Sequence, residues 1–428
     1  MKFSYSFVCA AAAFFPLVSA GSTSFVKYSS IGYSGHYNDI TNMDESTGTC
    51  TSSSKSFSGN LSPLDEELSV HIRGPIQLKK FAVYTTSSSS KKKREESPVG
   101  RRHQHQKREA DVKTVDVTET VYVTEGDDDT STVAPASTTS ATVAVASIGA
   151  VNKVLDAYHS TDVNPSSVAS SATASSSSSA STGTTSGSWT RKSYYDASAG
   201  TASNVVFMNH LGDSSYSGTW SSSFGNSISY ADASGTGKSK TATTLKDTTL
   251  ASDDEVVLFT GEKCGSDCGY YRSDIPAYKG WDGSTKIFAF NFQMPTDSGT
   301  KTTNNYDMPA VWLLNAKIPR TLQYGTESCS CWSTGCGELD LWEVITSGSS
   351  QMTNHLHDGQ GEDGTRWGGG GSSDYFTRPT SSAETFVAVF DGSNVYLKQV
   401  SNFDFDSSID ADTVNGWITG TASDAILV

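Results

Sequence analysis

The region from Trp189 to Val428 consists of short strand-like segments, and this pattern restricts the possible folds more than any other feature of the sequence. Aromatic and β-branched residues cluster in segments such as 285–292, 310–314 and 385–389, and turns rich in Gly, Asp, Asn and Ser separate them. Almost no stretch has the apolar periodicity of a long helix. Many short strands joined by polar turns predict an all-β domain, a jelly-roll β-sandwich.

Two segments of different composition precede this domain. Residues 21–85 are rich in Gly, Ser and Tyr and end in a run of alternating apolar and polar residues, which predicts a small β-rich N-terminal module. Residues 86–188 begin with basic clusters and end in a tract of Ser, Ala, Thr and Gly that cannot bury enough apolar surface to fold. We therefore expect a linker over 86–188, followed by the sandwich domain over 189–428.

The N-terminus has the features of a secretory signal. Lys2 precedes an apolar run over 7–18, and small residues follow up to Ala20, so residues 1–20 are typical of a cleaved signal peptide. No later stretch is apolar over the roughly eighteen residues that a membrane helix requires. We therefore expect a secreted protein of the cell wall or its surroundings, without a membrane span.

The cysteine count is consistent with secretion. The sequence has seven cysteines, and removal of Cys9 with the signal peptide leaves an even number. The six that remain are Cys50, Cys264, Cys268, Cys329, Cys331 and Cys336. An even number in a secreted chain indicates disulfides, although fifteen pairings are possible. A cysteine zinc site is the alternative, but the spacing fits no usual ligand pattern. Five of these cysteines follow the linker, so one of them is available to bond Cys50.

The net charge of the chain limits the kinds of molecule that we expect it to bind. The formal charge is −15 at pH 7, which argues against nucleic acid because proteins generally bind that polyanion with a basic surface. A neutral polysaccharide suits this charge better.

A basic run inside the linker suggests proteolytic processing. Lys107-Arg108 is followed by Glu109-Ala110, and this order resembles a fungal pro-peptide junction. We therefore expect a secretory dibasic processing protease to cleave at Lys107-Arg108. The alternative is a solvated linker that is never cut.

Three carboxylic acids are grouped near residue 340. On a regular strand Glu338 and Asp340 project to one face, and alternation would place Trp342 rather than Glu343 beside them. A β-bulge within this stretch would return Glu343 to the carboxylate face. The sequence therefore raises the possibility of three acids on one surface, with ordinary solvent-facing acids as the alternative.

Three clustered carboxyls suit glycoside hydrolysis. Their mutual repulsion raises the pKa of at least one of them, so a protonated acid and a carboxylate can coexist. With the bulge, the outer carboxyls of Glu338 and Glu343 should lie about 5 Å apart, the separation that predicts retention of anomeric configuration.

The motif resembles glycoside hydrolase family 16, whose laminarinase-like members carry a Glu-x-Asp-x-x-Glu strand and a concanavalin-like sandwich. The segment 308–314, Met-Pro-Ala-Val-Trp-Leu-Leu, is similar to the Pro-Ala-x-Trp-Leu strand of that family. The resemblance implies that Glu338 is the nucleophile, Asp340 a residue that tunes it, and Glu343 the general acid/base.

The same resemblance implies four substrate-binding residues. Trp332 is similar to the tryptophan that lines the cleft in that family, and Trp312 lies in the Pro-Ala-x-Trp-Leu strand. A buried core position is the alternative for both tryptophans. His357, or else His355, corresponds to the histidine that family 16 enzymes place beside the acid/base. The alternative for the two histidines is a metal pair, which lacks an obvious third ligand.

A narrower resemblance extends over nearly the whole chain. The runs LSPLDEELSVHIRGPIQLKKFAVYT and CSCWSTGCGELDLWEV are similar to ascomycete cell-wall glycosyl hydrolases that combine a Gly-rich N-terminal domain with a family 16-like domain. This implies cell-wall β-1,3-glucan as substrate and retaining endo-hydrolysis as the reaction. Transglycosylation by the same residues and non-catalytic glucan binding remain open alternatives. No cofactor or metal is expected, except for the structural calcium that some relatives of this fold bind.

Overall fold

The computed structural model describes residues 20–86, 180–182, 185, 187–301, 303–360 and 369–427. Nearly all of the predicted signal peptide lies outside these residues, as does the predicted cleavage site Lys107-Arg108. Among the described residues, no helix combines the length and the apolar character needed to cross a membrane.

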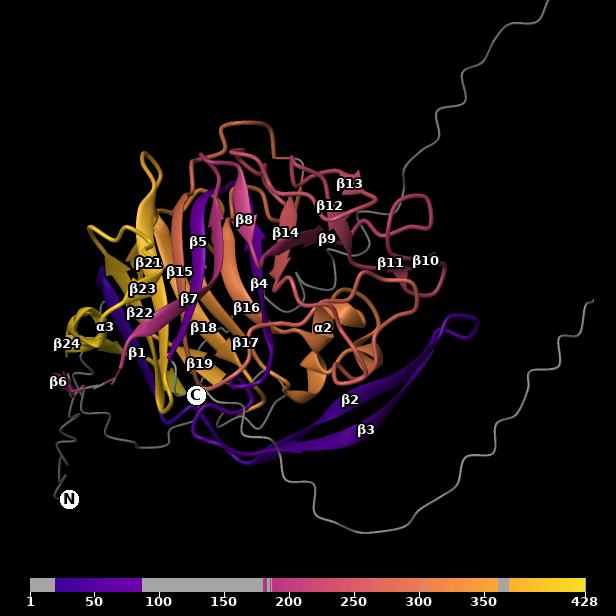
Figure 1. The fold of residues 1–428 in the computed structure, drawn as a ribbon, viewed down its shortest axis with the longest axis horizontal. Helices are drawn as coiled ribbons and strands as arrows, with labels where there is room; N and C mark the ends of the chain where they lie inside the picture. The colour runs from indigo at the N-terminus through magenta and orange to yellow at the C-terminus, as the bar shows by residue number, and fades with distance from the viewer. Residues whose placement is uncertain are drawn as a thin grey trace, which may run out of the picture. The chain divides into compact units, whose positions relative to one another are not determined.

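Two large sheets dominate the described residues (Figure 1). The first sheet has nine strands in the order β23 (Ser408–Ile409), β7 (Trp189–Asp196), β5 (Gln77–Thr86), β15 (Thr285–Gln293), β21 (Glu384–Asp391), β22 (Asn394–Val400), β1 (Phe25–Ser29) and β25 (Ser423–Asp424), with β8 (Thr201–Ser203) paired to β7. Its pairings are antiparallel except that of β1 with β25.

The second sheet has eleven strands and carries the candidate site. Their order is β13 (Lys238–Ser239), β12 (Ser229–Ala231), β9 (Val206–Asn209), β14 (Glu255–Phe259), β4 (Leu68–Arg73), β16 (Ala310–Asn315), β17 (Glu338–Glu343), β18 (Gln351–His357), β19 (Gly369–Gly371) and β26 (Ile426–Leu427), with β20 (Phe376–Thr377) paired to β18. The prediction of an all-β sandwich is confirmed.

The N-terminal segment is part of both sheets, which differs from the expected separate module over 21–85. β4 lies between β14 and β16, and β5 lies between β7 and β15. In Figure 1 these two indigo and purple strands run among magenta and orange ones. Alternating polarity indicated the strands correctly, but it carries no information about strand partners that are more than a hundred residues away.

The core between the sheets follows from the two-residue period of the strands. β15 contributes Phe288 and Phe290, and β4 contributes Val70 and Ile72, all fully buried in one cluster. Burial of a side chain of this size stabilises the fold by about 1.5–3 kcal/mol relative to exposure. The intervening residues of β4, Ser69, His71 and Arg73, therefore project to the opposite face of the second sheet.

The outer face of the first sheet is also apolar, because a helix covers it. Ile287 and Ala289 of β15 belong to a second cluster with Val414 and Ile418 of α3 (Ala411–Ile418). A strand buried on both faces needs apolar residues at every position, which explains the run Ile-Phe-Ala-Phe in β15.

The remaining described elements are smaller. They are the hairpin β2 (Gly35–Asp44) and β3 (Thr49–Phe57), the pairs β10 (Trp220–Ser221) with β11 (Gly225–Asn226) and β6 (Ala180–Thr182) with β24 (Thr419–Thr421), the helix α2 (Lys317–Arg320), and the 3₁₀ helices η1 (Glu327–Cys329) and η2 (Trp332–Thr334). The hairpin is joined to α2 by the ion pair of Lys317 with Asp39, at 2.8 Å.

The six cysteines that follow the predicted signal peptide all form disulfides, so the prediction of disulfides is confirmed and the alternative of a cysteine zinc site is wrong. The pairs are Cys50–Cys329, Cys264–Cys268 and Cys331–Cys336. The bond from Cys50 to Cys329 links the hairpin before the linker to η1 after it. The expectation that a cysteine of the C-terminal region bonds Cys50 is therefore confirmed.

Candidate active site

A β-bulge in β17 brings the three predicted carboxylates to one face. Asp340 is paired with Trp312 of β16 and Trp342 with the adjacent Val311, so Leu341 is the extra residue of the bulge. The pairing of β17 with β18 shifts at the same place. The predicted bulge is therefore present, and it makes two consecutive residues, Leu341 and Trp342, face the core.

The apolar side chains explain why the strand bulges there. Leu339, Leu341, Trp342 and Val344 all belong to the buried cluster between the sheets. Trp342 packs against aromatic rings of the first sheet, including Phe290 with ring centroids 5.6 Å apart. Turning Trp342 to the other face would forfeit about 3 kcal/mol or more of burial and packing, because aromatic side chains contribute most to such cores.

The three carboxylates line one pocket on the face of the second sheet that is turned away from the core. Its lining comes from four elements and one loop: Arg73 of β4, Trp312 and Leu314 of β16, Ile318 of α2, Glu338, Asp340 and Glu343 of β17, and Leu322 to Glu327, Ser330, Trp332 and Ser333 of the segment that contains η1 and η2. The empty volume between these residues, including the space that is open to solvent, is about 760 Å³.

Glu338 lies in an environment that favours its protonated form. Burial raises the pKa of Glu338 to about 8, and the negative charge of Asp340 adds to the effect. His357 and the Trp332 indole N–H, which donates to a Glu338 carboxyl oxygen, partly offset this rise. The free protein therefore holds a proton at Glu338 up to about neutral pH.

Glu343 lies in the opposite environment, because Arg73 is its partner. The Arg73 guanidinium donates to Glu343 Oε1 across 3.0 Å, and both side chains are less than a tenth exposed. Burial is the largest single effect and lowers the pKa of Arg73. The charge of Glu343, its hydrogen bond to Arg73, and the nearby Tyr324 and Glu255 together outweigh burial and hold the pKa above its ordinary value. The ion pair favours the carboxylate form of Glu343. Arg73 Nε also donates to the Met308 carbonyl oxygen, at 2.9 Å.

The two predicted histidines lie on β18, next to β17. In the antiparallel register His357 is opposite Glu338, and His355 is opposite Asp340. His357 Nε2 is 3.3 Å from Asp340 Oδ2, and the two imidazole rings have centroids 4.5 Å apart. The sequence thus located both histidines beside the carboxylates, and their role in substrate binding remains a prediction.

The two predicted tryptophans both line the pocket. Trp332 of η2 contacts Glu338 through its indole N–H, and its ring centroid is 6.2 Å from that of His357. Trp312 of β16 is only 5% exposed and stacks on His71, with centroids 5.0 Å apart. Trp312 is therefore largely buried, and it also lines the pocket.

Arg73, Gln323 and Tyr324 are pocket residues that sequence reasoning did not identify. Regular alternation along β4 places Arg73 on the same face as His71, so the strand pattern alone could have indicated the direction of the Arg73 side chain. The link to the carboxylates was missed because the segment was expected to fold as a separate module. Gln323 and Tyr324 lie in an irregular loop, where no periodicity reports the direction of side chains.

Comparison with known proteins identifies the family. Residues 24–86 match a family model described as cell wall protein YJL171C/Tos1, N-terminal, and residues 187–417 match the model of the C-terminal part of the same proteins. No solved structure gives a significant match. The family models do not test the resemblance to glycoside hydrolase family 16, which remains a prediction.

Curated relatives match along almost their entire length. A Candida albicans protein named "Probable circularly permuted 1,3-beta-glucanase TOS1" is 46% identical over 94% of this chain and 92% of its own. A Saccharomyces cerevisiae protein of the same name is 44% identical over 95% of this chain and 92% of its own. An Arthroderma benhamiae protein named "Probable circularly permuted 1,3-beta-glucanase" is 32% identical over 87% of this chain and 83% of its own. The chain therefore belongs to the YJL171C/Tos1 family of fungal cell wall proteins.

Proposed function

We propose that this protein is an endo-β-1,3-glucan hydrolase of the fungal cell wall that retains anomeric configuration. The observation that carries the proposal is the bulge in β17, which directs Glu338, Asp340 and Glu343 into one pocket. The names of the relatives support the substrate. These names also describe circular permutation. This agrees with the positions of the N-terminal strands, because β4 lies within the second sheet and β5 within the first, each between strands from later in the chain.

The proposed reaction is a double displacement. In the first step the Glu338 carboxylate attacks the anomeric carbon, while Glu343 donates a proton to the glycosidic oxygen of the departing sugar. In the second step water attacks the same carbon, its proton passes to Glu343, and the bond to Glu338 breaks. Asp340 lies between the two glutamates and modulates the charge of Glu338. Only side chains of this chain and water take part.

The proton must change place before this sequence can start. In the free protein the proton is held at Glu338 and the negative charge at Glu343, which is the reverse of what these roles require. Substrate binding would therefore move a proton to Glu343, or else the two glutamates exchange roles. The Trp332 N–H and His357 both favour the carboxylate of Glu338, which supports the nucleophile role implied by the family resemblance.

Azide rescue distinguishes the two assignments. Glycine variants of Glu338 and Glu343 would be assayed with an aryl laminaribioside in the presence of azide. A nucleophile variant gives the α-glycosyl azide, because azide attacks directly, whereas an acid/base variant gives the β-glycosyl azide from the covalent intermediate. We expect the α-glycosyl azide from Glu338→Gly. The β-glycosyl azide from that variant would instead identify Glu338 as the acid/base and Glu343 as the nucleophile.

The pocket is suited to a neutral sugar chain. Trp312 and Trp332 present aromatic surface, onto which the C–H face of β-linked glucose can pack. Ser330, Gln323 and Tyr324 contribute polar groups to the same lining, which can orient sugar hydroxyls.

A product time course on laminari-oligosaccharides tests the function, with the Glu338→Gln variant as control. Shorter products that the variant does not form would support hydrolysis. Products longer than the substrate would instead identify a transglycosylase. Binding without turnover in both proteins would identify a glucan-binding wall protein and overturn the proposal.

We also propose that a secretory protease cleaves at Lys107-Arg108 and that both pieces remain in one molecule. Cys50–Cys329 joins the parts before and after the linker, and β4 and β5 are hydrogen-bonded to strands of the later part on both edges. Cleavage of the linker breaks none of these contacts.

A further inference from the structure

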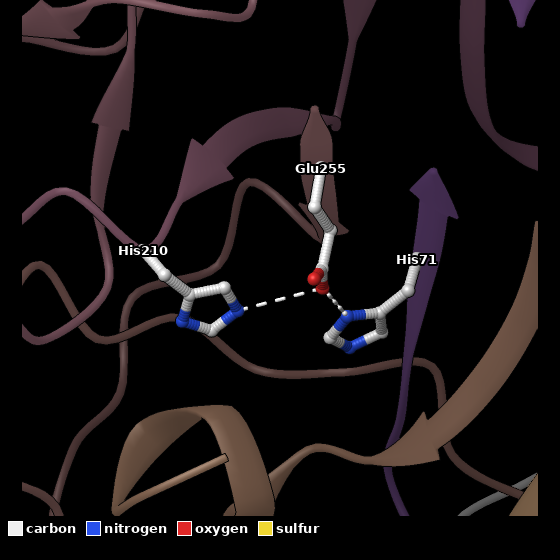
Figure 2. A group of neighbouring side chains, drawn as sticks. All are labelled: His71, His210 and Glu255. Atoms are coloured by element: carbon white, nitrogen blue, oxygen red, sulfur yellow. Dashed lines mark hydrogen bonds and ion pairs between the residues drawn. The ribbon is translucent and has the colours of Figure 1, made fainter. Parts of the chain in front are cut away.

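A second polar cluster lies beside the pocket and consists of His71, His210 and Glu255 (Figure 2). His71 lies on β4 and Glu255 on the adjacent β14, while His210 directly follows β9, the next strand of the sheet. Figure 2 shows the two imidazole rings on either side of the Glu255 carboxylate. The nitrogen and oxygen atoms that can bind a metal all lie within 4.8 Å of one another.

The distances within this cluster fit a small cation. His71 Nδ1 is 2.9 Å from Glu255 Oε1, and His210 Nε2 is 3.5 Å from the same oxygen. Ligands of a tetrahedral zinc ion lie about 3.4 Å apart, given bonds of roughly 2.0–2.1 Å. Small outward movements of the side chains would therefore admit a zinc ion.

The tautomer of His71 determines how its two ring nitrogens contact Ser69 and Glu255. The Ser69 hydroxyl has one hydrogen, which it donates to the Leu314 carbonyl oxygen at 3.1 Å. His71 Nε2 lies 2.9 Å from that hydroxyl oxygen and donates to it in the tautomer that carries its hydrogen on Nε2. In a neutral imidazole the other nitrogen, Nδ1, then has a lone pair. In this tautomer the lone pair faces a carboxylate oxygen at 2.9 Å, and a cation between the two atoms would make the contact favourable.

The position of His210 is the second observation that favours a metal. A second proton on His71 would satisfy the contact with Glu255 but would leave His210 as it is. Within the described part of the chain, His210 Nε2 is a buried atom whose contact with Glu255 Oε1, at 3.5 Å, has the length of an ion pair and not of a good hydrogen bond. A metal ion bound to both histidines and to Glu255 satisfies all three groups at once.

The surrounding residues hold the three groups in place. Ser69 fixes the ring of His71. Tyr324 donates its hydroxyl hydrogen to Glu255 Oε2, and Gln323 donates to Oε1 at 3.0 Å. Such partners orient metal ligands and sharpen their affinity.

We propose that His71, His210 and Glu255 form a zinc-binding site. Two imidazole nitrogens and one carboxylate oxygen are donors that zinc binds well. Because Gln323 and Tyr324 also line the pocket, the ion would fix this part of the pocket wall. The inference does not depend on the glucanase activity, since it concerns binding of the metal alone.

Zinc binding by the full-length secreted protein tests this proposal. Metal is removed with a chelator, and Zn²⁺ is then titrated by calorimetry and counted by elemental analysis. We expect one tightly bound zinc per chain and a melting temperature that rises with zinc concentration. Co²⁺ in its place should give the intense visible absorption of a tetrahedral site with histidine ligands.

Three variants assign the site. His210→Gln should weaken zinc binding by about 100-fold or more, and Ser69→Ala by about 10-fold, because the latter removes only the partner that orients His71. His36→Gln is the matched control, since His36 is an exposed histidine on β2, and it should bind zinc as the wild type does. Absence of tight binding in the wild type would overturn the proposal, as would unchanged binding in the folded His210→Gln variant.

Discussion

Arg73 on β4 and Glu343 on β17 form a buried ion pair at 3.0 Å, although they are 270 positions apart in the sequence. The pair joins the N-terminal segment to the strand that carries the candidate catalytic residues. The segment before the linker therefore completes the pocket as well as the sandwich.

Replacement of Arg73 by glutamine should destabilise the protein by about 3–5 kcal/mol, because it leaves the Glu343 carboxylate buried without its partner. Unfolding in denaturant measures this loss. The double variant Arg73→Gln/Glu343→Gln should recover much of the stability, since no unpaired charge remains.

The matched control is Lys80→Gln, which breaks the more exposed pair of Lys80 with Asp196 at 3.5 Å. It should cost less than about 1 kcal/mol. Equal losses for Arg73→Gln and Lys80→Gln would contradict the assignment of a strong buried pair.

Stability should fall with rising pH because of Glu338. Burial raises the pKa of Glu338 from 4.5 to about 8, so between these values the folded state binds more protons than the unfolded state. The resulting stabilisation is complete below pH 4.5 and is lost as the pH rises through about 8. In the Glu338→Gln variant this side chain cannot ionise, so its melting temperature should fall less than that of the wild type between about pH 5 and about pH 8.5.

Glu262→Gln, at an exposed side chain, is the control for this prediction and should follow the wild type. If wild type and Glu338→Gln lose stability in parallel across this range, the raised pKa of Glu338 is wrong.

Trp332→Phe should separate the aromatic surface from the hydrogen bond. Phenylalanine keeps a ring in the pocket but removes the N–H that donates to Glu338. Because this hydrogen bond lowers the pKa of Glu338, its loss should shift the acid limb of kcat/KM to higher pH and reduce kcat about 10-fold with little change in KM. Trp220→Phe, at a tryptophan that is 57% exposed, should change neither value.

Electrophoresis of the secreted protein tests the two-piece molecule. We expect one band without reductant and two fragments after reduction, because Cys50–Cys329 spans the cleavage site. Arg108→Ala should give a single band under both conditions. In Cys50→Ser/Cys329→Ser the pieces should still copurify in native buffer, held by the pairings of β4 and β5, and should separate in denaturing gels without reductant. Fragments that separate in native buffer would contradict this account.

The sequence predicted which way the side chains of β17 face, because the local pattern was sufficient. Leu339, Leu341, Trp342 and Val344 are the apolar residues, and only a bulge lets all four face the core while the acids face away. The three carboxylates, both tryptophans and both histidines therefore lie where the pattern and the family resemblance indicated. Whether they catalyse and bind as proposed depends on the experiments above.

The contribution of the N-terminal segment could not be predicted in the same way. The sequence indicated strands near Leu68–Arg73 and Gln77–Thr86, but strand pairing across a long linker depends on the packing of the whole core. For this reason Arg73 and His71 were not connected with Glu343 or Glu255. Their partners became apparent only when the register of β4 between β14 and β16 was known.

The configuration of the first product is the most direct test of the central claim. Proton NMR should follow the wild-type protein on a laminari-oligosaccharide, with Glu338→Gln as the inactive control. The account predicts that the new reducing end appears first as the β-anomer and reaches the equilibrium mixture only later, by mutarotation. Initial release of the α-anomer, or the same hydrolysis by Glu338→Gln, would contradict a retaining mechanism that depends on Glu338 and Glu343.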